Sequence, residues 1–240
     1  MKYIIILLFS GFISTTISAQ TNTNTMVDAS NEHQVSALPI TAGATISTYN
    51  VNKSSDIKGS IYLYDDWYND GKIFFSNNAK AYSLPTSNFN IQSRRFEMKY
   101  AKDSLFVINS SHIDKIIIRD KTFKLFKDPD YNSNALFEEI FSSDDILLVK
   151  KYKLAVNEGQ VNHMTGRKLS PDKYIKKEIY YISKHPEQED FNEVNFNKKL
   201  VYSLVDKDNQ DKVKAFYKEK NLSYKDENDL KILLNYSKSL

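Results

Sequence analysis

The chain has 240 residues, no cysteine and a formal net charge of +3. The lack of cysteine excludes disulfides and a lipid anchor attached through cysteine, so stability must come from an apolar core and hydrogen bonds. Lysines and carboxylates are interleaved along the sequence, which predicts no basic face. Nucleic-acid binding usually needs such a face, and we expect none here.

The first residues have the features of a secretion signal. Met1-Lys2 precedes an apolar run from Tyr3 to Phe9, and small residues lead to Ala19 before Gln20. This pattern predicts a signal peptide over residues 1–19, cut before Gln20. Its apolar core is shorter than the roughly 20 residues that a membrane-spanning helix needs. We therefore expect a soluble periplasmic or secreted protein that is not a lipoprotein and does not span the membrane after signal removal.

The next segment, residues 20–45, is rich in Thr, Asn, Ser and Gln with only scattered apolar residues. Such a composition cannot bury enough apolar surface to offset the entropy of ordering. The sequence therefore predicts a flexible leader here.

Residues 46–196 are predicted to form an antiparallel β domain. Tyr, Phe, Ile and Val are frequent and favour strands, and short apolar segments alternate with turn signals. The expected strands are Gly59–Tyr64, Lys72–Ser76, Arg95–Tyr100, Leu105–Ile108, Ile113–Arg119, Thr122–Phe126, Phe137–Phe141, Ile146–Ala155 and Tyr174–Ser183. Asn69-Asp70-Gly71 is expected to form a hairpin turn between the first two. Two further hairpins are expected: Ile113–Arg119 with Thr122–Phe126, and Phe137–Phe141 with Ile146–Ala155. Because only six glycines are present, we expect tight turns to use Asn and Asp.

Residues 197–240 have helical periodicity. Asn197 is a plausible N-cap for a first helix, and further helices are expected over Asp208–Lys220 and Asp226–Ser239. We expect these short helices to pack on the sheet. The predicted fold class is therefore mainly β or α+β: an antiparallel roll, sandwich or partly closed barrel followed by a short C-terminal helical appendage.

Two clusters are candidate binding residues. Trp67 and Tyr68 stand beside Asp66, and an aromatic next to a carboxylate can stack on and hydrogen-bond a sugar or peptide. The alternative is that the aromatics cap the core at a sheet end. Arg94 and Arg95 could grip an anionic group, or they could form a solvated strand edge.

One loop partly fits a calcium-binding pattern. The residues at its ligand positions are Asp128, Asp130, Asn132, Asn134 and Glu139. Ser133 replaces the glycine that the pattern requires, and a strand rather than a helix is expected before the loop. We therefore expect neither a metal nor any other cofactor.

No catalytic motif is found in the sequence. The expected function is that of an exported, non-catalytic binding or envelope-associated module, whose partner is an envelope protein, a peptide or a glycan. The alternative is a periplasmic or secreted hydrolase that uses carboxylates brought together by the fold, such as Asp65, Asp66 and Asp114.

Several short segments also bear on export and fold. They are Gly59-Ser60-Ile61-Tyr62-Leu63, Phe89-Asn90-Ile91-Gln92, Phe96-Glu97, Tyr180-Tyr181-Ile182, Lys214-Ala215-Phe216-Tyr217-Lys218-Glu219-Lys220-Asn221-Leu222, Asp229-Leu230 and Asn235-Tyr236. In these segments the chain resembles a group of uncharacterised exported proteins common in Bacteroidota, over most of residues 55–240. The resemblance supports the helical tail. That group carries no known activity, so the resemblance implies none.

Overall fold

The computed structural model describes residues 46–50, 57–76, 78–101, 104–108, 112–131 and 133–240. These residues all belong to the second of two compact units, His33–Leu240. The expected signal peptide and leader lie outside the described residues.

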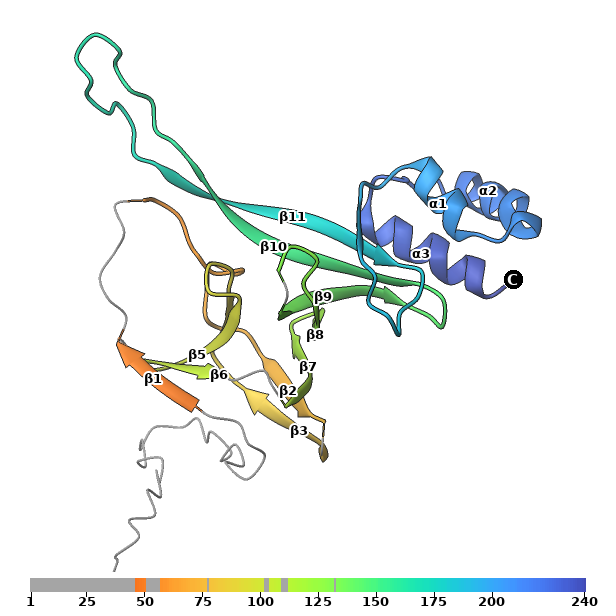
Figure 1. Cartoon of the computed structure of the whole chain (residues 1–240), viewed down its shortest axis with the longest axis horizontal. Helices are drawn as coiled ribbons and strands as arrows, with labels where there is room; N and C mark the ends of the chain where they lie inside the picture. The colour runs from red at the N-terminus through yellow and green to blue at the C-terminus, as the bar shows by residue number, and fades with distance from the viewer. Residues whose placement is uncertain (1–45, 51–56, 77, 102–103, 109–111, 132) are drawn as a thin grey trace, which may run out of the picture. The chain divides into compact units, whose positions relative to one another are not determined.

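The described β-strands form two antiparallel sheets (Figure 1). The smaller sheet has the strand order β1-β6-β5-β4. Its strands are β1 (Ile46–Asn50), β4 (Ser87–Asn90), β5 (Arg95–Ala101) and β6 (Ser104–Ile108). β5 and β6 form a hairpin, as the alternation in their sequence predicts.

The larger sheet has eight strands in the order β12-β11-β10-β9-β8-β7-β2-β3. They are β2 (Gly71–Phe75), β3 (Asn78–Leu84), β7 (Ile113–Ile118), β8 (Lys121–Lys127), β9 (Asn134–Ser142), β10 (Leu147–Asn157), β11 (Lys173–Ser183) and β12 (Asn192–Val194). β7 pairs with β8 and β9 with β10, so the two predicted hairpins are confirmed. The prediction of an antiparallel, mainly β fold is also confirmed.

The first predicted strand is wrong. Gly59–Tyr64 forms bends with single bridges, in which Tyr62 pairs with Asn90. The predicted hairpin turn at Asn69-Asp70-Gly71 is therefore also absent, and β2 begins directly at Gly71. The cause is the buried amide of Asn88, which donates to the carbonyl oxygen of Tyr64 and accepts from its N–H. A side chain thus satisfies backbone groups that a strand would have paired.

The tight turns use residues that the sequence did not predict. Positive φ angles occur at Thr86, Arg94, Arg119, Glu189 and Asn221, of which only one is an asparagine. Side chains with a Cβ rarely adopt this conformation. At Thr86 and Arg94 a side-chain bond accompanies it, from the Thr86 hydroxyl to the Lys99 carbonyl (2.6 Å) and from Arg94 to a buried carboxylate.

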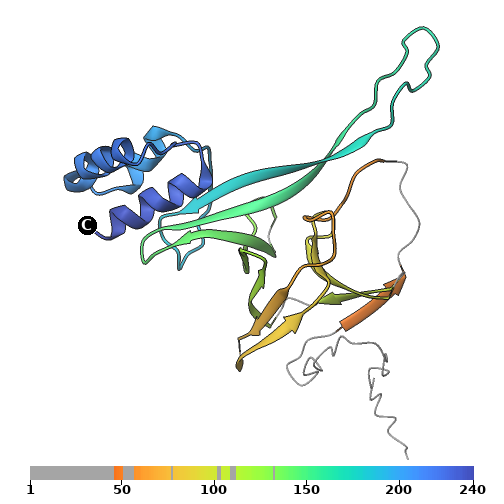
Figure 2. The same ribbon diagram turned by 180° about the vertical axis from the view of Figure 1, so that it is seen from behind.

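The two sheets face each other across one hydrophobic core, which we call the sheet core. It draws apolar side chains from both sheets, and Figure 2 shows the smaller sheet beside the β2 and β3 end of the larger one. Its buried members are Ile73, Phe75, Leu84, Phe89, Ile91, Phe96, Met98, Phe106, Ile108, Ile113, Ile116, Ile118, Phe123, Leu136 and Tyr152. Phe89, Phe96 and Phe123 form its centre, with ring centroids 5.1–5.2 Å apart.

Three helices follow the sheets: α1 (Lys198–Leu204), α2 (Gln210–Glu219) and α3 (Glu227–Lys238). The predicted N-cap is confirmed, because the Asn197 side chain accepts a hydrogen bond from the Leu200 N–H. Asp226 caps α3 in the same way, and two acidic residues in the first turn complement the helix dipole. Within the described part of the chain, no helix is both long and apolar enough to cross a membrane.

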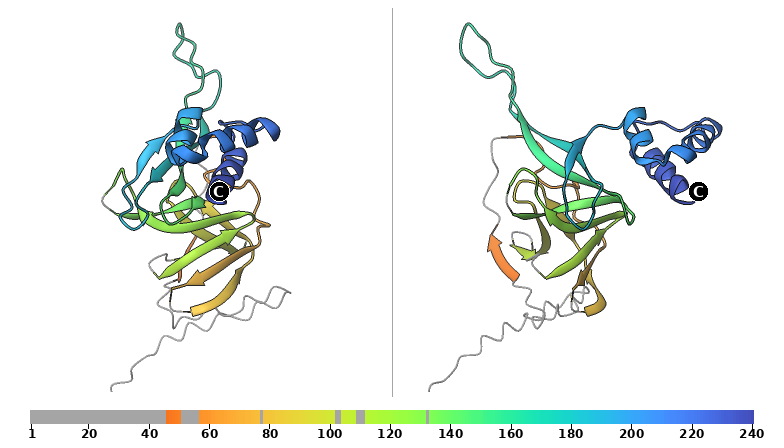
Figure 3. Two further views of the ribbon diagram at one scale, coloured as in Figure 1. Left: turned by 90° about the vertical axis from the view of Figure 1, so that its right-hand side faces the viewer. Right: turned by 45° about the vertical axis from the view of Figure 1, so that its right-hand side comes forward.

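The helices enclose a second core, which we call the helix core, against the β9–β11 end of the larger sheet (Figure 3). Leu230, Leu233 and Leu234 of α3 are fully buried there together with Leu148 of β10 and Ile182 of β11. The helices are shorter than isolated helices need to be for stability in water. Their packing on the sheet therefore holds them in place.

We expect the substitution Leu233→Ala to lower the free energy of unfolding by about 2–5 kcal/mol, because it leaves a cavity in the helix core. Urea unfolding measures the change. The neighbouring Ile232 is exposed, so Ile232→Ala serves as the control and should change stability by less than about 0.5 kcal/mol. Equal, small effects of both substitutions would contradict the packing of α3 on the sheet.

Candidate binding site

β10 has two adjacent lysines in its buried half. Lys150 and Lys151 are only 3% and 5% exposed. Successive side chains of a strand point to opposite faces of the sheet, so the two ammonium groups lie on different faces. A buried charge is strongly unfavourable unless it is paired, and each lysine binds its own set of carboxylates.

On one face Lys150 belongs to an ionic cluster that we call the seam, formed by the buried Glu138 and Lys150 and the partly buried Lys121 and Glu227. The Lys150 ammonium lies 2.7 Å from the Glu227 carboxylate and 3.2 Å from that of Glu138. Lys121 donates to the other oxygen of Glu138 (2.9 Å). The seam therefore joins three strands of the larger sheet to helix α3.

The seam separates the two cores. Along β9, Glu138 lies between Leu136 of the sheet core and Ile140 of the helix core. Lys150 occupies the equivalent place along β10, because it pairs directly with Glu138 across the two strands. The charged layer thus forms one continuous boundary inside the protein.

Two tyrosines complete the seam as hydrogen-bond donors. The Tyr152 hydroxyl donates to Glu138 (2.5 Å) and the Tyr180 hydroxyl to Glu227 (2.8 Å). Burial, and then the neighbouring carboxylates, raise the pKa of both phenols well above the ordinary value. Both therefore remain protonated, and neither can serve as a general base.

Glu227 stays ionised in the seam. Burial alone would raise its pKa, but the bonds from Lys150 and Tyr180 outweigh burial and hold the pKa below its usual value. The two cations of the seam balance its two carboxylates. This arrangement fixes α3 to the sheet.

On the opposite face Lys151 binds the turn between β8 and β9, whose described residues, 128–131 and 133, we call the acidic turn. The Lys151 ammonium donates to Asp128 (2.6 Å) and to Asp130 (2.8 Å). The second oxygen of Asp128 accepts from the Arg94 guanidinium (2.7 Å). The turn is closed by the Asp128 N–H, which donates to the Ser133 carbonyl (2.9 Å).

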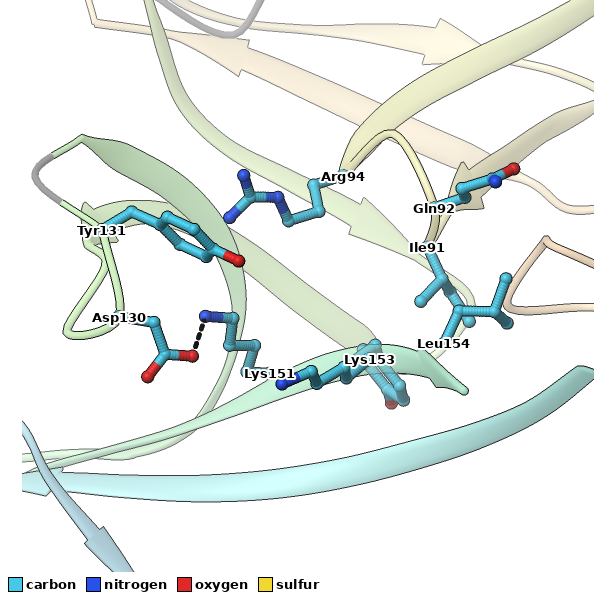
Figure 4. A pocket seen from close by; sticks show the side chains of 9 residues that line it. Ile91, Gln92, Arg94, Asp130, Tyr131, Lys151, Lys153 and Leu154 are labelled. Atoms are coloured by element: carbon cyan, nitrogen blue, oxygen red, sulfur yellow. Dashed lines mark hydrogen bonds and ion pairs between the residues drawn. The ribbon is translucent and has the colours of Figure 1, made fainter. Parts of the chain in front are cut away.

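An open hollow of about 250 Å³ lies between the acidic turn and β10 (Figure 4). It is lined by Ile91, Gln92, Arg94, Asp130, Tyr131, Lys151, Tyr152, Lys153 and Leu154. β9 and β10 pair only as far as Glu138 and Lys150, and their separation beyond this point leaves room for the hollow.

The two ends of the hollow differ chemically. Figure 4 shows Tyr131, Asp130 and Arg94 toward one end, and Ile91 beside Leu154 at the other. The Arg94 guanidinium lies 4.8 Å from the centre of the Tyr131 ring, a cation–π contact. The hollow therefore has a charged and aromatic end, whereas Leu154 and the exposed Gln92 line the other end, where Ile91 is only 2% exposed.

The carboxylate of the hollow is held in its ionised form. The hydrogen bond from Lys151 lowers the pKa of Asp130 and outweighs a small effect of burial. A general acid at neutral pH needs a raised pKa. Asp130 therefore suits ligand positioning or ion pairing rather than proton donation.

Only one of the five predicted binding residues, Arg94, lines the hollow. The Arg95 Nε donates instead to the buried carboxylate of Glu97 (2.9 Å). The fold thus directs the two neighbouring arginines to different carboxylates, and they do not act as a pair.

The other three predicted residues share a turn before β2. Arg119 donates two hydrogen bonds to the Asp66 carboxylate (3.0 and 2.8 Å). The Trp67 ring packs edge-on against Tyr62, with centroids 4.7 Å apart. Tyr68 is 91% exposed. Trp67 is thus partly used in packing, whereas Tyr68 presents a free aromatic surface.

The residues of the calcium-loop pattern bind lysines. Asp128 and Asp130 bind Lys151, and Glu139 binds Lys124 (2.8 Å). Asn132 lies outside the described residues. Among the residues that the structure describes, no group of three or more His, Cys, Asp or Glu side chains is arranged to hold a metal ion.

The structure does not bring together the three carboxylates suggested for a hydrolase, because they have no ion-pair partner in common. Asp65 binds Lys176 (3.0 Å), and Asp66 binds Arg119. Asp114 lies exposed on β7. The fold instead gathers Glu138 and Glu227, which the sequence did not single out.

One sequence signal could have identified these clusters. Lys150-Lys151 interrupts the apolar run Leu147–Tyr152, which is typical of a strand buried on both faces. Two charged residues at such a position require buried partners on each face. The identity of the partners depends on contacts distant in the sequence and could not be predicted.

No family model matches the chain, and comparisons with curated proteins and with solved structures also found no match.

We expect the substitution Lys150→Met to lower the free energy of unfolding by about 3–5 kcal/mol, because it removes the cation that the buried Glu138 and the partly buried Glu227 share. Chemical denaturation measures the change. Lys124→Met is the matched control, since its ion pair with Glu139 is partly exposed and should contribute at most about 1 kcal/mol. Similar losses in both variants would argue against a special role of the seam.

The lowered pKa of Glu227 predicts an acid-sensitive contribution to stability. The folded state binds the proton of this group more weakly than the unfolded chain, in which a glutamate has a pKa of about 4.3. The contribution is thus complete above this pH and is lost as the pH falls through the lower folded-state pKa. In urea unfolding, the stability difference between the unmodified chain and Glu227→Gln should shrink between about pH 6 and pH 3.

The control for this experiment is Glu158→Gln, which alters an exposed carboxylate. Its stability difference from the unmodified chain should stay small at every pH. A difference for Glu227→Gln that does not change with pH would mean that the carboxylate is not stabilised by the seam.

Proposed function

We propose that the chain is an exported, non-catalytic binding module of the cell envelope and that the hollow is its ligand site. The export signal at residues 1–19 and the resemblance to exported proteins of Bacteroidota support the location, and we place the chain with that group. We further propose that it acts in the periplasm or outside the cell.

The observation that carries the binding proposal is the pairing of an exposed aromatic ring with fixed cations. Tyr131 is 56% exposed, and it lies against Arg94, which Asp128 orients through a 2.7 Å bond. Lys153 adds a further cation to the lining. An open site with an aromatic surface and a few placed polar groups is typical of ligand recognition.

The chemistry of the hollow suggests the kind of ligand. Leu154 and Gln92 at one end fit a sugar-ring face, and the cations Arg94 and Lys153 fit an anionic group beside Tyr131. A peptide or glycan of the envelope that carries a carboxylate or phosphate meets both requirements. A hydrolase receives less support, because Asp130 has a lowered pKa and no second carboxylate lines the hollow.

Photo-crosslinking in the intact envelope tests this proposal. A benzophenone amino acid placed at position 131 should form an adduct in the exporting cell, because it replaces an aromatic ring of the hollow. The same amino acid at position 68, a more exposed tyrosine outside the lining, is the control. Adding Arg94→Ala should reduce the adduct at position 131 by about tenfold if the anionic end is used.

Two results would contradict the proposal. Equal adducts at positions 131 and 68, or none at position 131, would mean that the hollow is not the ligand site. Mass spectrometry of the exported protein provides a separate test of location. It should find a chain that begins at Gln20, whereas an intact Met1 on folded protein would contradict processed export.

A further inference from the structure

The distal half of the β10–β11 hairpin forms a feature that we call the arm, residues 153–177. Lys153 pairs with Lys177 and Asn157 with Lys173, and the intervening residues complete a regular antiparallel register. Figures 1 and 2 show the connection between β10 and β11 extending past the other strands of the larger sheet. The distal part of the arm is therefore covered neither by the smaller sheet nor by the helices.

The connection between β10 and β11 has a defined conformation. The Gly159 N–H donates to the Asp172 carboxylate (2.9 Å), and the Leu169 N–H donates to the Gln160 carbonyl (2.7 Å). A Cβ on Gly159 would come within 1.8 Å of the Ser170 carbonyl oxygen, so only glycine fits there. The tip is thus held in one conformation by its own hydrogen bonds.

The arm exposes apolar side chains that contribute to no core. Five of the nine large hydrophobic side chains that are exposed in the described structure lie on it: Val156, Val161, Met164, Leu169 and Ile175. Met164 is 96% exposed and Leu169 is 65% exposed. Single exposed apolar residues are ordinary, but such a concentration marks an interaction surface.

The arm is also basic, so the even mixture of charge that the sequence suggested is wrong for this part of the chain. It carries six cationic side chains and two carboxylates, a net charge of +4 in a chain whose total is +3. All six cations are exposed. The rest of the chain therefore has a net charge of −1.

Two lysines of the arm lie directly opposite each other, and one of them, Lys153, also interacts with the Asp130 carboxylate. Lys153 and Lys177 are direct cross-strand partners, and like charges at such positions repel each other. Lys173 and the exposed Ile175 lie on the same face, because their positions have the same parity along β11. An anionic surface beside this face would relieve the repulsion.

We propose that the arm docks the protein onto an anionic lipid surface. Met164 and Leu169 enter the headgroup region of the bilayer, and the lysines of the arm contact the lipid phosphates. Lipid fits better than a soluble polyanion, because a polyanion would use the charges but would leave the apolar tip in water. Apolar insertion and attraction to anionic headgroups together determine peripheral membrane binding. Lys153 and Leu154 at the base of the arm also line the hollow, but the tip of the arm and Lys173 and Lys177 do not, and this inference rests on them.

Vesicle sedimentation tests the proposal with the protein purified from cells that export it. Vesicles of phosphatidylcholine with about one third phosphatidylglycerol should bind it at least about tenfold more tightly than phosphatidylcholine alone, and added salt should weaken the binding. The double substitution Met164→Ser/Leu169→Ser removes the apolar tip, and Lys173→Glu/Lys177→Glu reverses the charge. Each should reduce binding to the anionic vesicles by about tenfold or more.

A matched control alters the same residue types away from the arm. Ile232→Ser/Lys212→Glu changes an exposed isoleucine and an exposed lysine of the helices and should bind as the unmodified protein does. Circular dichroism verifies that each variant is folded. We expect folding to be retained because the altered side chains are exposed.

Three outcomes would overturn the proposal. They are equal binding to neutral and anionic vesicles, loss of binding in the helix control, and binding that does not depend on Met164 and Leu169. In the last case, retention on a heparin column with the same dependence on Lys173 and Lys177 would identify a soluble polyanion as the partner instead.

Discussion

The ion pair of Lys150 with Glu138 and Glu227 is the interaction on which the arrangement of the described structure depends. It occupies the boundary between the sheet core and the helix core, where β9 and β10 continue from one to the other. Burying these charges is costly, and apolar residues of similar volume can be equally stabilising or more so. We expect the benefit of a charged boundary to lie in specificity, because the Glu227 carboxylate is paired with Lys150 only when α3 lies in this place on the sheet.

The neighbouring lysine shows how one strand can serve two purposes. Lys150 points into the protein and fixes a helix, whereas Lys151 points to the other face and fixes the acidic turn, with Arg94 bound to the same carboxylate. The hollow therefore gains its rigidity from the same strand that holds the cores together. Farther along, β10 leaves its partner β9 and continues into the arm with β11 alone.

The sequence predicted the features that depend on neighbouring residues. Alternation and turn residues identified the β7–β8 and β9–β10 hairpins, and Asn197 marked the start of α1. The segment Gly59–Tyr64 was misread because a distant amide, Asn88, takes the backbone hydrogen bonds of Tyr64 at its end. For the site, Arg94 was identified, but Tyr131 and Lys151 were not, because their importance arises only when the acidic turn meets β10. The net positive charge of the arm was not recognised in the sequence, because Glu158 and Asp172 stand among its cations. The hairpin brings these cations together.

The position of Trp67 has a consequence for following this protein by spectroscopy. It is the only tryptophan, and its ring touches Tyr62 in the segment that borders the smaller sheet. Its fluorescence therefore reports on that border and does not sense the helices directly, whereas far-ultraviolet circular dichroism near 222 nm is dominated by helices. The two signals follow opposite sides of the charged boundary. Coincident transitions would mean that the boundary transmits unfolding from one core to the other, and separate transitions would mean that it divides the chain into two cooperative units.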